Sequence, residues 1–279
     1  MIDFIQAIPG PMFLLVYAFV CILTIYLTYS YRDSLDSTND LPFPGIESFL
    51  PEEIAYLRGG VNEVIRITLF RLWNKGAITI EGKQKETKIT QNYYEPESNL
   101  EQTVYDHIKG NTTRIDIFNS ELRDKVEFLI FPIRKSLVDK NLLNRDGDYN
   151  KLAAVVIVGH SFTFLLGIIK IFLGLTNDHP TFFLILLFIV LMLIQYFIRP
   201  SVPKLTKLGT RFITVIQNSF RWMAEDVKNG VQPPGIDLAF APAIFGTAIL
   251  ASIFLPFAES FPSQEQAQED NVGGCGGGG

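Results

Sequence analysis

Long apolar runs alternate with polar stretches along this chain, and three of the runs contain almost no charge. They cover residues 11–31, 152–175 and 181–198. As helices they would be about 27–36 Å long, which matches the roughly 30 Å hydrocarbon core of a bilayer. A buried helix in a soluble protein usually has an apolar run of only about 10–14 residues. We therefore predict three transmembrane helices in a mainly α-helical, multi-pass membrane protein.

A fourth apolar segment, residues 236–258, allows two interpretations. It is long enough to span a bilayer, but Asp237, Pro242 and Pro256 weaken it as a membrane helix. No Lys or Arg follows Lys228, and the tail is acidic, which is compatible with an exported C-terminus. We favour a fourth transmembrane helix, and the alternative is a re-entrant or interfacial helix.

The distribution of Lys and Arg predicts the orientation. Residues 1–10 and 176–179 contain neither, whereas residues 32–151 and 199–235 contain many. Cytoplasmic loops carry the excess of basic residues, so the N-terminus is predicted outside and the large loop 32–151 in the cytoplasm. The first apolar run has no positive region before it and no small-residue cleavage site behind it, which indicates a retained anchor and not a cleaved signal peptide.

After a linker at residues 32–49, the phrase PEEIAYLRGG (residues 51–60) has the pattern of a short capped helix. Pro51 suits the first helical position, and the two following acids favour the positive end of a helix. Gly59 is predicted to end the helix in the left-handed conformation. Tyr56 and Gly60 have no such local explanation.

The next stretch predicts a small α+β domain. Residues 61–74 have helical apolar spacing, Gly76 ends that helix, and AITI and TKIT read as two strands around a polar loop. This order is typical of a winged-helix unit, and residues 98–150 repeat it more weakly. We predict two winged-helix-like units in tandem, at residues 50–95 and 98–150.

Charge argues against DNA as the partner of this domain. Residues 32–151 contain seventeen Lys and Arg against twenty Asp and Glu, a net charge of −3. DNA-binding domains usually present a basic face, and the helix at residues 61–74 carries Glu63 beside Arg66 and Arg71. A protein partner is therefore favoured, and a membrane-tethered regulator that contacts DNA through Arg66 and Arg71 is the alternative.

Two ionisable residues fall within the second apolar run, and such residues are often functional. His160 and Lys170 are the candidates for an enzyme or transporter, although a neutral imidazole packed between helices is the simpler interpretation of His160. Lys170 lies near the predicted outer end of its helix and can extend to the interface. The runs carry no paired acids, which are the usual sign of transport.

The sequence predicts no metal or cofactor. By the predicted topology, His107, His160 and His179 fall in three different compartments and cannot form one site. Cys21 and Cys275 are too differently placed to suggest a disulfide framework. Cys275, in the glycine-rich tail 259–279, is a candidate for modification.

Several short motifs occur in a characteristic order. They are PGP before the first run, EIAYLRGG, L..KG.I, GLTNDHPTFFLILL, LTKLG, AIFGTAIL and a Gly/Cys tail. In these the chain resembles a family of uncharacterised bacterial multi-pass membrane proteins with a YEIAYLRGG-type signature and a glycine- and cysteine-rich C-terminus. The resemblance implies a location in the bacterial inner membrane and no particular activity. The tail departs from the family by being short and having one cysteine.

The preferred hypothesis is a membrane-anchored protein-interaction or scaffold module without catalysis. Its docking surface is predicted at Tyr56, Arg58, Gly59 and Gly60, because packing explains these residues least.

Overall fold

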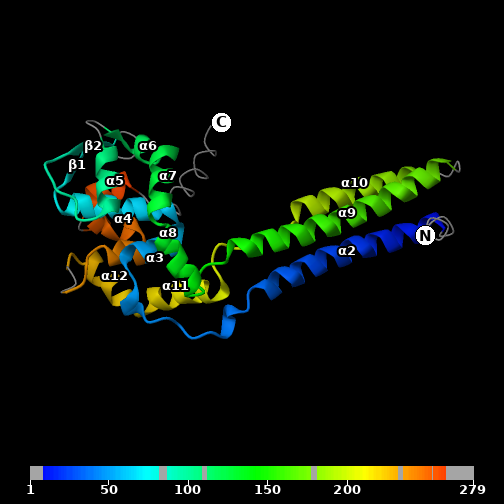
Figure 1. Ribbon diagram of the computed structural model, residues 1–279, viewed down its shortest axis with the longest axis horizontal. Helices are drawn as coiled ribbons and strands as arrows, with labels where there is room; N and C mark the ends of the chain where they lie inside the picture. Colours follow the sequence, from blue (N-terminus) through cyan, green and yellow to red (C-terminus); the bar gives the residue numbers. More distant parts are fainter. Residues whose placement is uncertain are drawn as a thin grey trace, which may run out of the picture. The chain divides into compact units, whose positions relative to one another are not determined.

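The structure, a computed structural model, describes residues 9–81, 87–108, 112–176, 181–231, 235–252 and 254–261 of the chain (Figure 1). It consists of two compact units. Unit 1 comprises Met1–Asp40 and Asn144–Lys204, and unit 2 comprises Leu41–Leu143 and Leu205–Gly279. Each unit therefore combines segments that lie far apart in the sequence.

Unit 1 contains three apolar helices that run alongside one another (Figure 1). They are α2 (Gly10–Leu35), α9 (Asp146–Thr176) and α10 (Phe182–Phe197). The helices α2 and α9 are long and apolar enough to cross a membrane. Helix α10 has 16 residues and is shorter, about 24 Å at 1.5 Å per residue.

The apolar side chains of unit 1 point mostly outward. Only 17% of the most apolar window of the first helix is buried, and 22% of that of α9. Leu15, Phe19 and Phe172 are 76%, 64% and 64% exposed. The core helix of a soluble protein would bury such side chains, whereas most of the apolar side chains on these helices are exposed.

Glycines allow α9 to approach its two neighbours closely. A Cβ atom on Gly167 would lie 2.5 Å from a ring carbon of Phe188 on α10 and 2.9 Å from the hydroxyl oxygen of Tyr17 on α2. A Cβ atom on Gly159 would lie 2.8 Å from the methyl group of Thr24. Small residues at helix contacts are typical of packing within membranes, where van der Waals contact replaces the hydrophobic effect.

The first element of unit 2 is the short 3-10 turn η2 (Ile46–Ser48), and an α+β arrangement follows it. Its first part contains α3 (Pro51–Gly59), α4 (Val61–Asn74), β1 (Ile78–Glu81), β2 (Lys88–Gln91), α5 (Asn99–His107), β3 (Thr112–Thr113), α6 (Arg114–Ile117), α7 (Ser120–Leu129) and α8 (Phe131–Asp139). Helix α4 is buried along most of its length, and α3, α5 and α7 all contact it. The core therefore forms around α4.

The predicted hairpin is confirmed, and the two segments predicted as winged-helix-like units in tandem are joined through one sheet. Gly76 (φ +72°) ends the helix as expected, and β1 pairs with β2 in antiparallel register. The connecting loop, residues 82–86, lies outside the described residues. Strand β3, from the second predicted unit, pairs with β2 of the first. The segments 50–95 and 98–150 thus share one sheet and one core.

The predicted fourth transmembrane helix at residues 236–258 is wrong as a continuous helix. The segment forms α13 (Phe240–Phe245), the 3-10 turn η4 (Thr247–Ser252) and α14 (Leu255–Ser260). Gly246, with φ +88°, ends α13, and Pro256 lies in the first turn of α14. Each element has six residues, about 9 Å for the two α-helices and about 12 Å for the 3-10 turn, which is far too short to cross a bilayer.

These short elements are apolar because they complete the core of unit 2. The ring of Trp73 on α4 lies 5.3 Å from that of Phe254 and 5.7 Å from that of Phe257. The ring of Phe261 lies 6.2 Å from that of Phe118. The C-terminal segment that begins at Leu205 therefore belongs to the same unit as most of the domain predicted at residues 50–150. The last residues of that predicted domain, from Asp146 onward, form the start of α9 instead.

Helix α11 (Lys207–Ser219) is fixed to the earlier part of unit 2 through a backbone contact. Leu143 and Leu205 form an antiparallel bridge, and the N–H of Thr206 donates to the carbonyl of Leu142 over 3.1 Å. The Thr206 hydroxyl caps the helix by accepting from the N–H of Gly209. A Cβ atom on Gly209 would lie 2.1 Å from the Leu142 carbonyl oxygen, so only glycine fits here.

We predict that Gly209→Ala destabilises unit 2 by about 1–3 kcal/mol, because backbone must move to admit the methyl group. Both tryptophans, Trp73 and Trp222, belong to unit 2. Their fluorescence during denaturant unfolding of the full chain in detergent therefore measures this loss.

The matched control is Gly147→Ala in the first turn of α9, where an added Cβ atom would meet nothing within 4 Å. It should leave the tryptophan transition unchanged. Equal stability of the two variants would contradict the tight contact at Leu142.

Candidate functional site

The phrase at residues 51–60 forms the predicted helix α3, with one correction at its end. The N–H of Leu50 donates to the carboxylate of Glu53 over 3.0 Å, and Pro51 takes the first helical position. Gly60, not Gly59, has the positive φ (+74°) that turns the chain into α4. Gly59 is needed for space, since a Cβ atom there would lie 2.3 Å from Cγ of Glu63.

The turn between α3 and α4 encloses a buried cluster of charges. Glu63 forms ion pairs with both Arg58 and Arg66, and the three side chains are 2%, 10% and 6% exposed. The guanidinium carbon of Arg66 also lies 4.9 Å from the ring centroid of Phe118. Burial lowers the pKa of Arg66 although Glu63 acts in the opposite direction. One carboxylate thus compensates two buried guanidinium groups.

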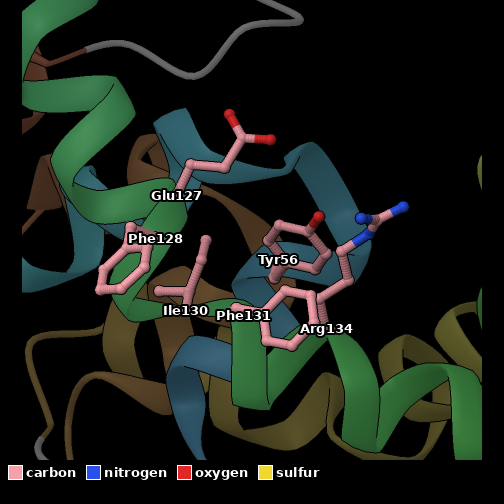
Figure 2. A pocket seen from close by; sticks show the side chains of 6 residues that line it. All are labelled: Tyr56, Glu127, Phe128, Ile130, Phe131 and Arg134. Atoms are coloured by element: carbon pink, nitrogen blue, oxygen red, sulfur yellow. The ribbon is translucent and has the colours of Figure 1, made fainter.

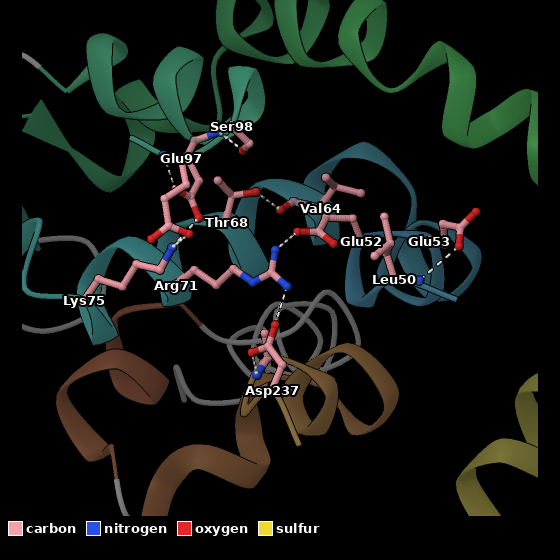
Figure 3. Close-up of polar contacts among 12 residues, drawn as sticks. Leu50, Glu52, Glu53, Val64, Thr68, Arg71, Lys75, Glu97, Ser98 and Asp237 are labelled. Carbon is pink, nitrogen blue, oxygen red and sulfur yellow. Dashed lines mark hydrogen bonds and ion pairs between the residues drawn. The ribbon is translucent and has the colours of Figure 1, made fainter. Parts of the chain in front are cut away.

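A second set of ion pairs joins α4 to the C-terminal segment (Figure 3). Arg71 pairs with Glu52 on α3 and with Asp237. Asp237 in turn accepts from the N–H of Ala239 over 2.9 Å and so positions the start of α13.

Lys75, at the end of α4, pairs with Glu97 at 2.8 Å and with Glu101 at 3.1 Å. Burial alone would lower the pKa of Lys75, but the hydrogen bonds to these carboxylates outweigh it and raise the pKa. Lys75 therefore stays charged and holds α5 to α4.

These pairs bear on the alternative of DNA contact. Arg66 is buried, and Arg71 is held by two carboxylates, so neither forms part of an exposed basic face. A contact between these two side chains and phosphate would require both sets of ion pairs to break. Arg58, in the predicted docking surface, is likewise held in an ion pair with Glu63. Arg58 and Gly59 both pack against Glu63 and do not form an exposed patch.

We predict that Glu63→Gln costs about 3–5 kcal/mol in the free energy of unfolding, because two buried guanidinium groups lose the carboxylate with which both form ion pairs. Tryptophan fluorescence in a denaturant titration measures the loss.

Glu121→Gln is the matched control, since Glu121 and Lys125 form an exposed pair worth at most about 1 kcal/mol. In addition, the triple variant Arg58→Met, Glu63→Leu and Arg66→Met should recover stability, because it removes all three charges. A Glu63→Gln protein as stable as the Glu121→Gln protein would refute this account.

A pocket of about 380 Å³ opens where α3, α7 and α8 meet (Figure 2). It is lined by Tyr56, Glu127, Phe128, Ile130, Phe131 and Arg134. Tyr56 is only 5% exposed and forms part of the wall, whereas Phe128 and Phe131 are 81% and 60% exposed. In the view of Figure 2, the rings of Tyr56 and Phe131 face the same opening, with Glu127 and Arg134 at its edges.

Polar contacts fix α8 against the start of α3 and so hold the pocket in shape. The Ser136 hydroxyl donates to Glu53 over 3.1 Å, and Lys140 lies 3.5 Å from the same carboxylate. The ammonium group of Lys140 also lies 3.9 Å from the ring centroid of Phe49.

Sequence reasoning identified Tyr56 but missed Phe128 and Phe131. The available signal was the FLIFP stretch, in which a Pro at the start of α8 interrupts a helix beside two aromatic residues.

The candidate His160 in α9 links two helices of unit 1. Its Nδ1 lies 2.7 Å from the carbonyl oxygen of Val156, and its Nε2 lies 3.2 Å from that of Gln195. The Tyr29 hydroxyl donates over 2.9 Å to the carbonyl of Ile198. The carbonyls of Gln195 and Ile198 both lie at the end of α10, where carbonyl groups have no intrahelical donors. These contacts give His160 a structural role.

Lys170, the second intramembrane candidate, is not brought together with His160. The two are ten residues apart on α9, which corresponds to about 15 Å. The Lys170 ammonium lies 5.2 Å from the ring centroid of Phe13.

Within the described part of the chain, His, Cys, Asp and Glu side chains form no group that could hold a metal ion. Cys21 is buried in unit 1. His107 lies 3.2 Å from the carbonyl of Asp116. His179, Cys275 and most of the tail lie outside the described residues, as do residues 1–8 of the predicted external N-terminus.

Comparisons of the chain with protein-family models, with curated proteins and with solved structures found no match.

Proposed function

We propose that this chain is a membrane-anchored protein-interaction module that docks a protein partner in the pocket of α3, α7 and α8. The observation that carries the proposal is the pair of exposed aromatic rings, Phe128 and Phe131, at the mouth of a formed pocket. Exposed aromatic residues around a pocket are typical of the central part of protein interfaces.

The pocket favours a partner of defined chemistry. Its walls are mostly aromatic and aliphatic, while Arg134 and Glu127 supply opposite charges at its edges. A partner segment with one large apolar side chain and a neighbouring carboxylate, directed to Arg134, complements both features. Of the docking surface expected at Tyr56, Arg58, Gly59 and Gly60, the proposed pocket keeps Tyr56 and replaces the other three residues.

Membrane anchoring in the bacterial inner membrane is the second part of the proposal. We place three spans at α2, α9 and α10, with the N-terminus outside and unit 2 in the cytoplasm. The exposed apolar side chains of these helices and the concentration of Lys and Arg in the connected segments support this arrangement. It also agrees with the family that the sequence resembles.

The fold of residues 236–258 changes the expected side of the C-terminus. Without a fourth span, the tail follows unit 2 and stays in the cytoplasm. We predict that a membrane-impermeant maleimide leaves Cys275 unlabelled in intact cells and labels it after permeabilisation.

Cys275→Ala provides the background, because Cys21 is buried within unit 1. Labelling of Cys275 in intact cells would reverse the orientation. Recovery of the full chain in the supernatant after alkaline extraction would remove the anchoring altogether.

For docking, we predict that a photo-crosslinking phenylalanine analogue at Phe128 forms one discrete adduct in intact cells. The protein in that adduct, once identified and purified, should bind the full chain in detergent at least tenfold more weakly after Phe131→Asp, because a charge then replaces the apolar contact.

Tyr93 is the control position, since it is fully exposed and lies outside the pocket. The same adduct from position 93, or unchanged affinity of the Phe131→Asp variant with an intact tryptophan unfolding transition, would refute the pocket as the docking site.

A further inference from the structure

We propose that the exposed face of helix α11 binds the headgroups of anionic phospholipids. This surface is separate from the docking pocket, which belongs to α3, α7 and α8. Headgroup binding by α11 rests on the membrane anchoring proposed above and does not depend on the protein partner of the docking pocket.

Helix α11 is divided sharply into two faces. Its buried face consists of Leu208, Gly209, Phe212 and Ile216. Its exposed positions are Lys207, Thr210, Arg211, Thr214, Val215, Asn218 and Ser219. The helix carries two bases and no acid, although the whole chain has a net charge of −5. Because the apolar face packs into unit 2, the face left exposed is the polar one that carries both bases, and basic side chains attract anionic headgroups.

Helix α12 (Arg221–Lys228) directly follows and extends the basic character. It has bases at both ends, and Trp222 is 44% exposed. The segment 205–230 contains four bases and two acids, a net charge of +2. Tryptophan is enriched where protein meets the bilayer interface, because its ring is both apolar and a hydrogen-bond donor.

All three connections between unit 2 and the apolar helices reach unit 2 at α11. On the side of α2, the ring of Phe43 lies 6.3 Å from that of Phe212, and the guanidinium of Arg211 lies 5.1 Å from the Phe43 centroid. On the sides of α9 and α10, Leu143 and Leu205 form the bridge that precedes α11.

The connections are also short. Residues 36–40 follow α2, residues 144–145 precede α9, and residues 198–204 follow α10. No connection between an apolar helix and unit 2 is therefore longer than seven residues.

Beside a bilayer, the charge of the lipids matters. Anionic headgroups attract Lys and Arg, and the attraction decays within about one Debye length, roughly 8–10 Å at physiological salt. The side chains of Val215 and Trp222 and the aliphatic stems of Lys207 and Arg211 can lie in the interface. The charged ends of Lys207 and Arg211 then contact the headgroups.

The test places a nitroxide label at Val215→Cys in the Cys275→Ala chain, reconstituted into nanodiscs of phosphatidylcholine alone or with a quarter phosphatidylglycerol. Collisions with a water-soluble nickel complex and with oxygen report whether position 215 faces water or lipid. We expect phosphatidylglycerol to lower the nickel accessibility at least twofold. The parent chain without Val215→Cys should take up no label, since Cys21 is buried.

Lys207→Glu with Arg211→Glu should restore the accessibility seen in phosphatidylcholine. The matched control is Arg123→Glu with Lys125→Glu on α7, two exposed bases outside the proposed surface, which should change nothing. An intact tryptophan unfolding transition shows that both double variants are folded.

Equal accessibility in the two lipid compositions would overturn the proposal, as would an equal effect of the two double variants. Dipolar broadening between labels, which indicates a second copy of the chain on this face, would also overturn it. Loss of the chain from nanodiscs on alkaline washing is a different result, since it refutes the anchoring and not the headgroup contact.

Discussion

Unit 2 depends on the burial of helix α4 together with the charges that it carries. An arginine inside a protein is costly unless a carboxylate and suitable geometry compensate it. Glu63 provides this for Arg58 and Arg66, and Glu52 provides it for Arg71. Because these pairs join α3 to α4, the turn between the helices cannot open without exposing uncompensated charge. Tyr56, which forms one wall of the pocket, lies on α3 and is held in place by this rigid pair of helices.

Two apolar segments of the chain fold differently for a simple physical reason. Residues 182–197 form one helix whose side chains are largely exposed, whereas residues 236–258 are divided into pieces that fold back on α3 and α4. A lipid-facing segment must satisfy its own backbone hydrogen bonds, which only a continuous helix provides. A segment broken at Gly246 and Pro256 must find a protein interior instead.

The candidate site shows how local explanation and tertiary contact differ. The capping of α3, including Pro51 and the acids of its first turn, follows from the sequence and is present in the structure. Tyr56 lacked a local explanation, and its explanation is tertiary, because it forms the wall of a pocket completed by α7 and α8. The Pro at the start of α8 marks the helix break beside Phe128 and Phe131 in the sequence, but the pocket that they line forms only because α8 packs against α3.

The sequence by itself determined the two long apolar helices, the capped helix α3, the end of α4 at Gly76 and the β1–β2 hairpin. Each of these follows from hydropathy or from the preference of one residue for one backbone conformation. Only the tertiary structure decided that β3 joins the first hairpin, that Arg66 and Arg71 lie in ion pairs, and that residues 236–258 belong to the core. Such outcomes depend on partners distant in the chain, and no local pattern specifies which of several apolar or charged partners a side chain will meet.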